Sequence, residues 1–599
     1  MDFRNLNTLW ASVLTETLVR LGLEVAVVCP GSRSAPLAIA LAQQPGLEAI
    51  PVLDERSAAF FALGLAKQTG KPIVLLCSSG TAGANFYPAV IEAHESRVPL
   101  LVLTADRPPE LRDCNAGQTV DQQKLFGSFV NWYHEVSLPA AAFSQLTYLR
   151  QTTIHAWEQT QWPVPGAVHL NLPFRDPLAP VTQPEVMALA AAFDEAQFFA
   201  GVGSGQAGAA GWGDGVIRSE RISEHISEHI KAAASPPLSL SSSLSLSSPK
   251  GILIAGVAQF SSPAAAQDYC RAIARLSSHL GFPVLAEGLS PLRNYASLNP
   301  HLISSYDMLL RNPERAAALA PDVVIRIGEM PTSKELRGWL AQTQPRQWVI
   351  DEGDRNLDPL HLRTTHLRGS VQQLVAMLPA TTAVPTPYLQ QWLKAEADCW
   401  NQQREKMRSL DALIEGKAAW LLSQCLPPGT PLFIANSTAV RYVEWFWEPG
   451  DRAIQPFCNR GANGIDGTLS TALGIAHRHQ PSVLLTGDLA LLHDTNGFLL
   501  RPQFRGHLTI VLINNRGGGI FENLPIAQFD PPFEGFFATP QPVQFAQICA
   551  TYSVEHQLIQ TWEQLEQSLK ILPTEGIRVL ELTCDRKQNA RWLAQRTPR

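Results

Sequence analysis

Short apolar runs alternate with helical patterns along most of the chain and divide it into three blocks. The first block, residues 1–185, has near-continuous apolar runs at residues 24–31, 50–54, 71–80, 98–108 and 167–174. Such runs are typical of strands that helices cover on both faces of a parallel sheet. Several of them end in glycine, serine, threonine, aspartate or arginine, so polar groups are expected to collect at the carboxyl ends of the strands.

Two later blocks repeat this pattern. The second block, residues 251–384, has runs at residues 251–257, 282–288, 322–330 and 346–353. The third block, residues 385–599, has runs at residues 431–437, 481–489, 508–515 and 577–585. The pattern predicts an α/β fold of three doubly wound parallel-sheet domains. The central domain is Rossmann-like, but no G-x-G-x-x-G follows its first strand, so a nucleotide there is not supported.

Residues 186–250 lose the alternation. Residues 201–215 are rich in glycine, and residues 235–250 are rich in serine and proline. Such composition buries too little apolar surface to order itself, so we expect a linker or an insertion. A small His/Glu duplication at residues 222–229 lies in this context, which favours a solvated segment over a metal site.

Composition narrows the class of protein. The chain has 599 residues, 45% of them hydrophobic and 17% charged, which indicates a multidomain globular protein. Its net charge of −6 gives no reason to expect a nucleic-acid partner. No membrane-spanning run and no secretory signal are visible. Nine cysteines without C-x-x-C pairs favour reduced thiols, so we expect a cytoplasmic location.

The third block carries the most informative polar positions. Asp488 closes one apolar run, and Asn515 closes the next, twenty-seven residues later. One crossover in a parallel sheet would bring these strand ends side by side. Together with the glycine-rich backbone at residues 517–519, their oxygens suit Mg²⁺ or a similar cation that also holds a diphosphate. Taken alone, a capping or turn role explains these residues about equally well.

Glu55 stands at a similar junction in the first block, between the run at residues 50–54 and a predicted helix at residues 57–66. A carboxylate there stabilises a helix start by up to about 1 kcal/mol. Strand ends of open α/β sheets also face ligand crevices. The residue by itself does not decide between these two roles.

The spacing of Gly487-Asp488 and Asn514-Asn515 resembles the signature of thiamine-diphosphate (ThDP) enzymes. Five longer segments are similar to one branch, the 2-succinyl-5-enolpyruvyl-6-hydroxy-3-cyclohexene-1-carboxylate synthases: residues 29–37, 54–67, 78–93, 104–113 and 459–474. This resemblance implies decarboxylation of 2-oxoglutarate and 1,4-addition of the resulting carbanion to isochorismate, in menaquinone or phylloquinone biosynthesis.

The resemblance also implies roles for particular residues. Glu55 would contact the aminopyrimidine of ThDP and activate the cofactor. Asp488, Asn515 and the Gly517 carbonyl would bind Mg²⁺ or Mn²⁺. Further cofactor contacts would be Asn436, Ser437, Gly464, Ile465, Gly487 and Leu489. Substrate contacts would be Ser32, Arg33, Arg107, Gln118, Arg293, Arg441, Arg460, Ile520 and Phe521. Arginines in this set suit substrates with two carboxylates, which pair well with planar guanidinium groups.

The same resemblance implies active sites between the N-terminal domain of one subunit and the C-terminal domain of another, in a homodimer or a dimer of dimers. Two positions depart from the expected pattern: Leu489 follows Asp488 where many ThDP enzymes have glycine, and Gly117 precedes Gln118 where a polar side chain is expected. Two alternatives stay open. One is a carboligase resembling acetolactate synthase, and the other is a non-catalytic scaffold, which should have lost Glu55, Asp488 or Asn515.

Overall fold

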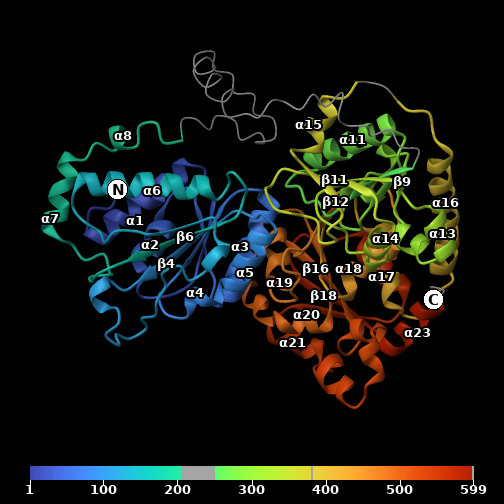
Figure 1. Ribbon diagram of the computed structural model, residues 1–599. Coiled ribbons are helices and arrows are strands. Elements are labelled where there is room, and N and C mark those ends of the chain that lie inside the picture. Colours follow the sequence, from blue (N-terminus) through green and yellow to red (C-terminus); the bar gives the residue numbers. More distant parts are fainter. Residues whose placement is uncertain (204–249, 380–381, 597–599) are drawn as a thin grey trace.

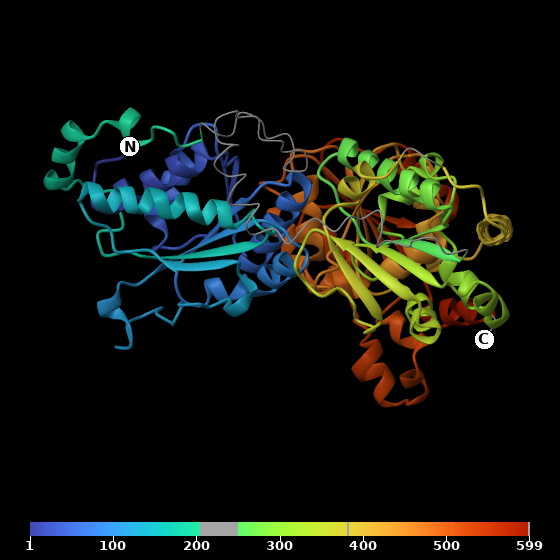
Figure 2. The same cartoon turned by 45° about the horizontal axis from the view of Figure 1, so that its top comes forward.

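The computed structural model describes residues 1–203, 250–379 and 382–596. It contains three six-stranded parallel sheets with helices on both faces, so the predicted α/β fold class is confirmed (Figure 1). Figures 1 and 2 show the N-terminal domain at one end of the molecule and the other two domains packed together at the other end. The His/Glu duplication at residues 222–229 lies outside the described residues.

The N-terminal sheet has the strand order β2-β1-β3-β4-β6-β5. Its strands are β1 (Val25–Val28), β2 (Glu48–Pro51), β3 (Ile73–Cys77), β4 (Leu100–Asp106), β5 (Trp132–Glu135) and β6 (Ala167–Pro173). Its helices are α1 (Leu6–Arg20), α2 (Ala35–Gln43), α3 (Glu55–Thr69), α4 (Ala82–Asn85), α5 (Tyr87–Glu95), α6 (Phe143–Gln159), α7 (Pro184–Met187) and α8 (Glu195–Phe198).

Residues 186–203 of the predicted linker continue this domain. Val186 and Phe199 are buried in the same apolar cluster as α1, and the Phe193 ring packs on Phe3 with a centroid separation of 5.5 Å. These apolar residues give the start of the segment enough surface to bury against the N-terminal domain.

The central sheet has the order β12-β11-β10-β7-β8-β9. Its strands are β7 (Gly251–Ala255), β8 (Val284–Ala286), β9 (Leu302–Ile303), β10 (Val323–Ile327), β11 (Arg346–Asp351) and β12 (Arg363–Arg368). Its helices are α11 (Pro263–Leu280), α12 (Tyr306–Leu310), α13 (Pro313–Ala318), α14 (Lys334–Thr343) and α15 (Val371–Ala376).

The C-terminal sheet, β14-β13-β15-β16-β18-β17, repeats the strand order of the N-terminal one. Its strands are β13 (Pro431–Ile434), β14 (Gln455–Phe457), β15 (Ser482–Gly487), β16 (His507–Asn514), β17 (Glu555–Ile559) and β18 (Gly576–Thr583). Its helices are α17 (Glu415–Cys425), α18 (Thr438–Phe446), α19 (Thr468–Ala476), α20 (Asp488–His493), α21 (Phe545–Thr551), α22 (Trp562–Lys570) and α23 (Arg586–Arg596). Helix α16 (Pro387–Arg408) precedes them and bridges two cores, because Trp392 packs in the central domain and Trp400 in the C-terminal one.

Helix α3 joins the N-terminal and C-terminal domains of one chain. Asp54 caps it by accepting the amide of Ser57 at 2.8 Å, and Gly70 ends it in the left-handed conformation. Its residues are buried almost throughout, because it packs on its own sheet and on α19. One apolar cluster therefore runs through both domains.

Glycines permit the close approach of α3 and α19. A Cβ atom at Gly64 would lie 2.1 Å from the Thr471 carbonyl oxygen, and one at Gly474 would lie 2.2 Å from that of Phe61. Only hydrogen fits at these two positions while the helices keep their separation. Among the described residues, no helix is long and apolar enough to cross a membrane.

Candidate active site

Two neighbouring strand ends in the C-terminal domain carry Asp488, Asn515 and Gly517, which we call the C-terminal cluster. Strands β15 and β16 pair in parallel, with Gly487 opposite Ile513, so the predicted juxtaposition of Asp488 with Asn515 is confirmed. Asp488 is 5% exposed, and its Oδ2 accepts the Gly517 amide at 2.7 Å. Burial raises the pKa of Asp488 to about 6, although hydrogen bonds from the Leu489 and Gly517 amides oppose the shift.

Asn515 is as buried as Asp488, and only one of its two polar side-chain atoms has a hydrogen-bond partner in the part of the chain that the structure describes. Its Nδ2 donates to Oε1 of Glu415 at 3.1 Å. Its Oδ1 has no hydrogen-bond partner among the described residues. Burial raises the pKa of Glu415 to about 7, with a smaller contribution from the nearby charge of Asp488, while the hydrogen bond from Asn515 opposes the shift.

The glycines that follow β16 make room for this cluster. Gly517 has φ +130°, a conformation that side chains rarely adopt, and a Cβ there would lie 2.3 Å from the Ala538 carbonyl oxygen. The Gly517 carbonyl accepts the Gly519 amide at 2.8 Å. At Gly487, by contrast, a Cβ would meet nothing within 4 Å, so open space borders the strand end.

A loop between β14 and α19 supplies further predicted residues. Asn436 donates to the Asn459 carbonyl at 2.8 Å and to the Gly464 carbonyl at 2.6 Å. Its Oδ1 accepts Nη1 of Arg460 at 2.9 Å, and Nη2 of the same arginine reaches Thr332 of the central domain at 3.1 Å. Two strand ends and the central domain thereby fix Arg460.

Arg441 adds a second cation close to Arg460. It follows Ser437, a non-glycine residue at φ +64° whose carbonyl accepts the Arg441 guanidinium. Burial lowers the pKa of Arg441, and repulsion from Arg460 and Arg337 adds to this effect. Like charges gathered in a partly buried site favour an anion.

Arg293 lies at the interface of the central and C-terminal domains, and its charge and that of Arg460 both act on Glu287. Its side chain is fully buried, its Nη1 donates to the Glu444 carbonyl oxygen at 2.8 Å, and its Nη2 lies 3.3 Å from Oε2 of the same residue. These contacts connect the central and C-terminal domains, and the substrate contact of Arg293 stays a prediction.

The apolar residues predicted around the cofactor and substrates all belong to the C-terminal domain. Ile465, Leu489, Ile520 and Phe521 are all partly exposed. Ile520 and Phe521 belong to a 3₁₀ turn, Gly519–Asn523, that directly follows the Asn515 loop. The Phe521 ring packs edge-on against Phe537 with centroids 5.8 Å apart.

The N-terminal domain holds a separate group of predicted residues. Arg107 donates to Oγ of Ser79 at 2.7 Å and to the Gly117 carbonyl at 3.0 Å. Gln118 donates to the Ser79 carbonyl at 2.9 Å. The backbone oxygen of Gly117 therefore helps to position Arg107.

Ser32 is exposed, and Arg33 beside it is 7% exposed. Arg33 donates to the Phe174 carbonyl at 2.9 Å. Burial lowers the pKa of Arg33, and repulsion from Arg107 adds to the effect, which places the two cations near one another.

Glu55 begins α3 and is partly exposed, as expected for the junction. Its charge contributes to raising the pKa of Cys29 and Cys77, which lie at the ends of β1 and β3, although burial is the main cause. The Glu55 carboxylate therefore lies near the carboxyl ends of β1 and β3. No described interaction joins Glu55 to Asp488 or Asn515 within one chain.

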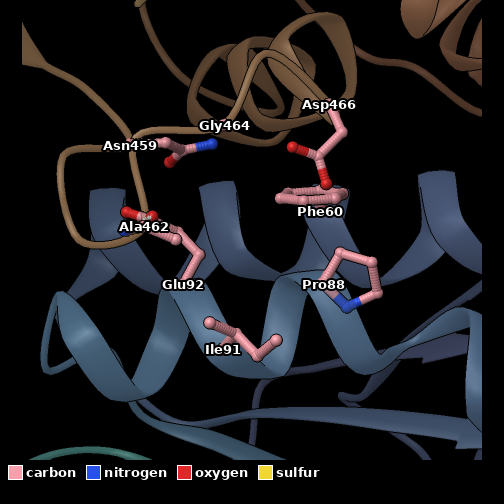
Figure 3. Close-up of a pocket in the computed structure, with 8 residues that line it drawn as sticks. All are labelled: Phe60, Pro88, Ile91, Glu92, Asn459, Ala462, Gly464 and Asp466. Carbon is pink, nitrogen blue, oxygen red and sulfur yellow. Dashed lines mark hydrogen bonds between the residues drawn. The ribbon is translucent and has the colours of Figure 1, made fainter.

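The N-terminal and C-terminal domains of one chain also contact each other directly. A pocket of about 130 Å³ lies between α3 and α5 on one side and the loop at residues 459–466 on the other. Figure 3 shows the residues that line it. Glu92 of α5 accepts the Gly461 amide at 3.0 Å and the Ala462 amide at 2.7 Å. This buried carboxylate therefore holds the loop that carries Arg460.

Comparison with known proteins agrees with the arrangement. The family described as "Thiamine pyrophosphate enzyme, N-terminal TPP binding domain" matches residues 10–125, and "Middle domain of thiamine pyrophosphate" matches residues 228–434. Relatives named 2-succinyl-5-enolpyruvyl-6-hydroxy-3-cyclohexene-1-carboxylate synthase occur in Trichormus variabilis, a Nostoc species and Gloeothece citriformis.

Their similarity covers whole chains. The Trichormus protein is 59% identical over 98% of this chain and 97% of its own length, and the Nostoc protein is 58% identical with the same coverage. The Gloeothece protein is 57% identical over 99% of this chain and 98% of its own. The chain belongs to this synthase family. The predicted family and the enzyme type that uses thiamine diphosphate are thereby confirmed.

The residues of this synthase fit a divalent cation with a diphosphate. Asp488 is a buried carboxylate, Oδ1 of Asn515 is an unpartnered oxygen, and the Gly517 carbonyl lies in the same loop. Hard oxygen donors of this kind suit Mg²⁺ or Mn²⁺. The described residues contain no cluster of three or more His, Cys, Asp or Glu side chains that could bind a metal ion. The proposed ligands include only one carboxylate, that of Asp488, so they would not form such a cluster.

Sequence reasoning missed two residues that shape the site of this synthase. Glu415 contacts Asn515 from the start of α17, and Glu92 holds the Arg460 loop from the N-terminal domain. Both are acids within ordinary helical segments, so their local sequence carries no signal. The burial of each acid, 1% and 2% exposed, distinguishes them only once the fold is known.

Proposed function

We propose that this synthase decarboxylates 2-oxoglutarate and joins the remaining four-carbon unit to isochorismate by 1,4-addition, releasing CO₂ and retaining the enolpyruvyl group. The product would be 2-succinyl-5-enolpyruvyl-6-hydroxy-3-cyclohexene-1-carboxylate, in menaquinone or phylloquinone biosynthesis. Family membership at 54–59% identity supports this reaction. The observation that carries it is the group of guanidinium side chains around the two strand-end clusters.

Both substrates are dicarboxylates, and the predicted arginines support a site that binds such anions. Arg441 and Arg460 lie beside the C-terminal cluster, and Arg33 and Arg107 lie at the strand ends of the N-terminal domain. Ser32 and Gln118 lie near the latter pair in sequence and structure. A carboligase for small neutral acceptors has no use for so many fixed cations, so this observation favours the dicarboxylate reaction.

The proposed cofactor site is made of residues from both domain types. Asp488, Oδ1 of Asn515 and the Gly517 carbonyl would hold Mg²⁺ or Mn²⁺, and Asn436, Ser437, Gly464, Gly487 and Leu489 would surround the diphosphate. Bound ThDP supplies a nucleophilic carbon and accepts the electron pair that decarboxylation leaves behind. Glu55 would hold a proton at the aminopyrimidine ring, Ile465 would support the cofactor, and Ile520 and Phe521 would exclude water from the reacting carbon.

The proposal includes an assembly and a location. Glu55 and Asp488 belong to separate clusters of one chain, which supports active sites shared between subunits of a homodimer or a dimer of dimers. We infer a location in the cytoplasm, in keeping with the reduced thiols of the described cysteines, which form no disulfide.

The experiment that tests this function measures isochorismate consumption and CO₂ release by the purified protein with 2-oxoglutarate, ThDP and Mg²⁺. We expect consumption to require every component and to match CO₂ in amount. Release of CO₂ that does not depend on isochorismate would point to another acceptor. Binding of ThDP without any turnover would favour the scaffold alternative.

A further inference from the structure

The side chain of Asn515 has one satisfied and one unsatisfied polar atom. Its Nδ2 donates to Oε1 of Glu415 at 3.1 Å, whereas its buried Oδ1 has no partner among the described residues. A buried carbonyl oxygen without a partner costs free energy unless a ligand or an ion supplies one. The oxygen is therefore available for a ligand that arrives from outside the protein.

Glu415 decides which way this amide faces. A carboxylate oxygen accepts hydrogen bonds, so it selects the orientation in which the NH₂ group of Asn515 points toward it. The carbonyl oxygen then faces away from Glu415. Glu415 itself is 1% exposed and begins α17, which packs against α18, so its position is fixed by the core of the domain.

We propose that Glu415 is a positioning residue for the metal site: it orients Asn515 so that Oδ1 coordinates the divalent cation held by Asp488. This inference rests on the proposed function, which places a cation there. Partners that orient a metal ligand commonly change metal affinity by 10–100-fold when they are removed.

The neighbouring residue provides a matched comparison. Asn514 also donates its side-chain amide to a glutamate, Oε1 of Glu581, at 2.6 Å. Its Oδ1, however, accepts the Arg516 amide at 3.3 Å, so this asparagine keeps both polar atoms satisfied within the protein. The chain thus offers two adjacent Asn–Glu pairs, of which only one is assigned to the metal.

The test is a titration of the full-length protein with Mn²⁺ in the presence of ThDP, with free Mn²⁺ followed by electron paramagnetic resonance. Glu415→Met keeps the length of the side chain, removes the acceptor and avoids a buried charge. We expect it to raise the Mn²⁺ dissociation constant at least about tenfold. Glu415→Gln retains an acceptor oxygen and should stay within about threefold of the wild type, as should Glu581→Met.

Wild-type Mn²⁺ affinity in a folded Glu415→Met protein would overturn the proposal. So would an equal loss in Glu581→Met, because the effect would then be general to buried glutamates near the strand ends. Circular dichroism reports folding, and Glu415→Leu supplies a second acceptor-free variant if Glu415→Met does not fold.

A double variant separates positioning from a general structural effect. In an Asn515→Ala background, Glu415→Met should change Mn²⁺ affinity by no more than about twofold, because the side chain through which it acts is gone. A full tenfold loss in that background would overturn the proposal. Failure of the wild-type protein to bind Mn²⁺ with ThDP would instead overturn the proposed cofactor site, so the two failures are distinguishable.

Discussion

At the scale of single residues, Asp54 and Glu55 stand side by side at the start of α3, where the sequence alone did not decide between a helix-start role and a ligand-binding role for Glu55. Asp54 caps α3 by accepting the Ser57 amide, and its other oxygen accepts Asn496 of the C-terminal domain at 2.8 Å. Among the described residues, the Glu55 carboxylate makes no hydrogen bond or ion pair. Asp54 is therefore the helix cap, whereas Glu55 is an acid in the first turn whose carboxylate stays available for a ligand.

We predict that Glu55→Gln binds ThDP nearly as well as the wild type but turns over at least about 100-fold more slowly, because the amide cannot hold the proton at the cofactor ring. Steady-state turnover and quenching of tryptophan fluorescence by ThDP measure the two quantities. Asp54→Asn makes the same chemical change one residue earlier and keeps the cap, so its turnover should stay within about threefold of the wild type. Near-normal turnover of Glu55→Gln would return that residue to a helix-start role.

At the scale of elements, the glycine contact between α3 and α19 makes a sharp prediction. In Gly474→Ala, the new methyl group meets a backbone oxygen that cannot move alone, so the helices must separate. We expect a loss of stability of about 1–3 kcal/mol or more, seen as a lower melting temperature. Gly338→Ala on α14 is the control, since a Cβ there meets nothing within 4 Å, and it should be neutral or stabilising. Equal melting temperatures of the two variants would show that the contact is not tight.

The strands that the sequence missed all lie at sheet edges, although one edge strand, β2, was predicted. The strands missed were β5, β9, β12, β14 and β17, and each of them is the edge of a sheet. Edge strands are short or carry polar residues, as in Arg363–Arg368 (RTTHLR), because one side of the strand is unpaired. Interior strands show long apolar runs, so β15 and β16 were predicted, and with them the Asp488–Asn515 pair. Glu415 and Glu92 were not, because their contacts depend on the packing of helices far apart in the sequence.

At the scale of the whole molecule, the two clusters of predicted residues belong to different domains, and subunit mixing tests how they are assembled. Glu55→Gln and Asp488→Ala chains should each be inactive alone. In a hybrid dimer with shared sites, one site carries both substitutions and the other carries none. Random mixing should therefore restore about a quarter of wild-type activity. Verified exchange of subunits without recovered activity would contradict sites shared between subunits.

The Glu92 contact has a consequence for such a dimer. The N-terminal domain that would present Glu55 to one active site also contacts, through Glu92, the loop that carries Arg460 of its own C-terminal domain. In the proposed dimer that arginine serves the other active site. The N-terminal domain would thus contribute to two catalytic centres. A rotation of this domain that closed one centre would also move the Arg460 loop of the other centre. Communication between the two centres would then need no dedicated signalling element.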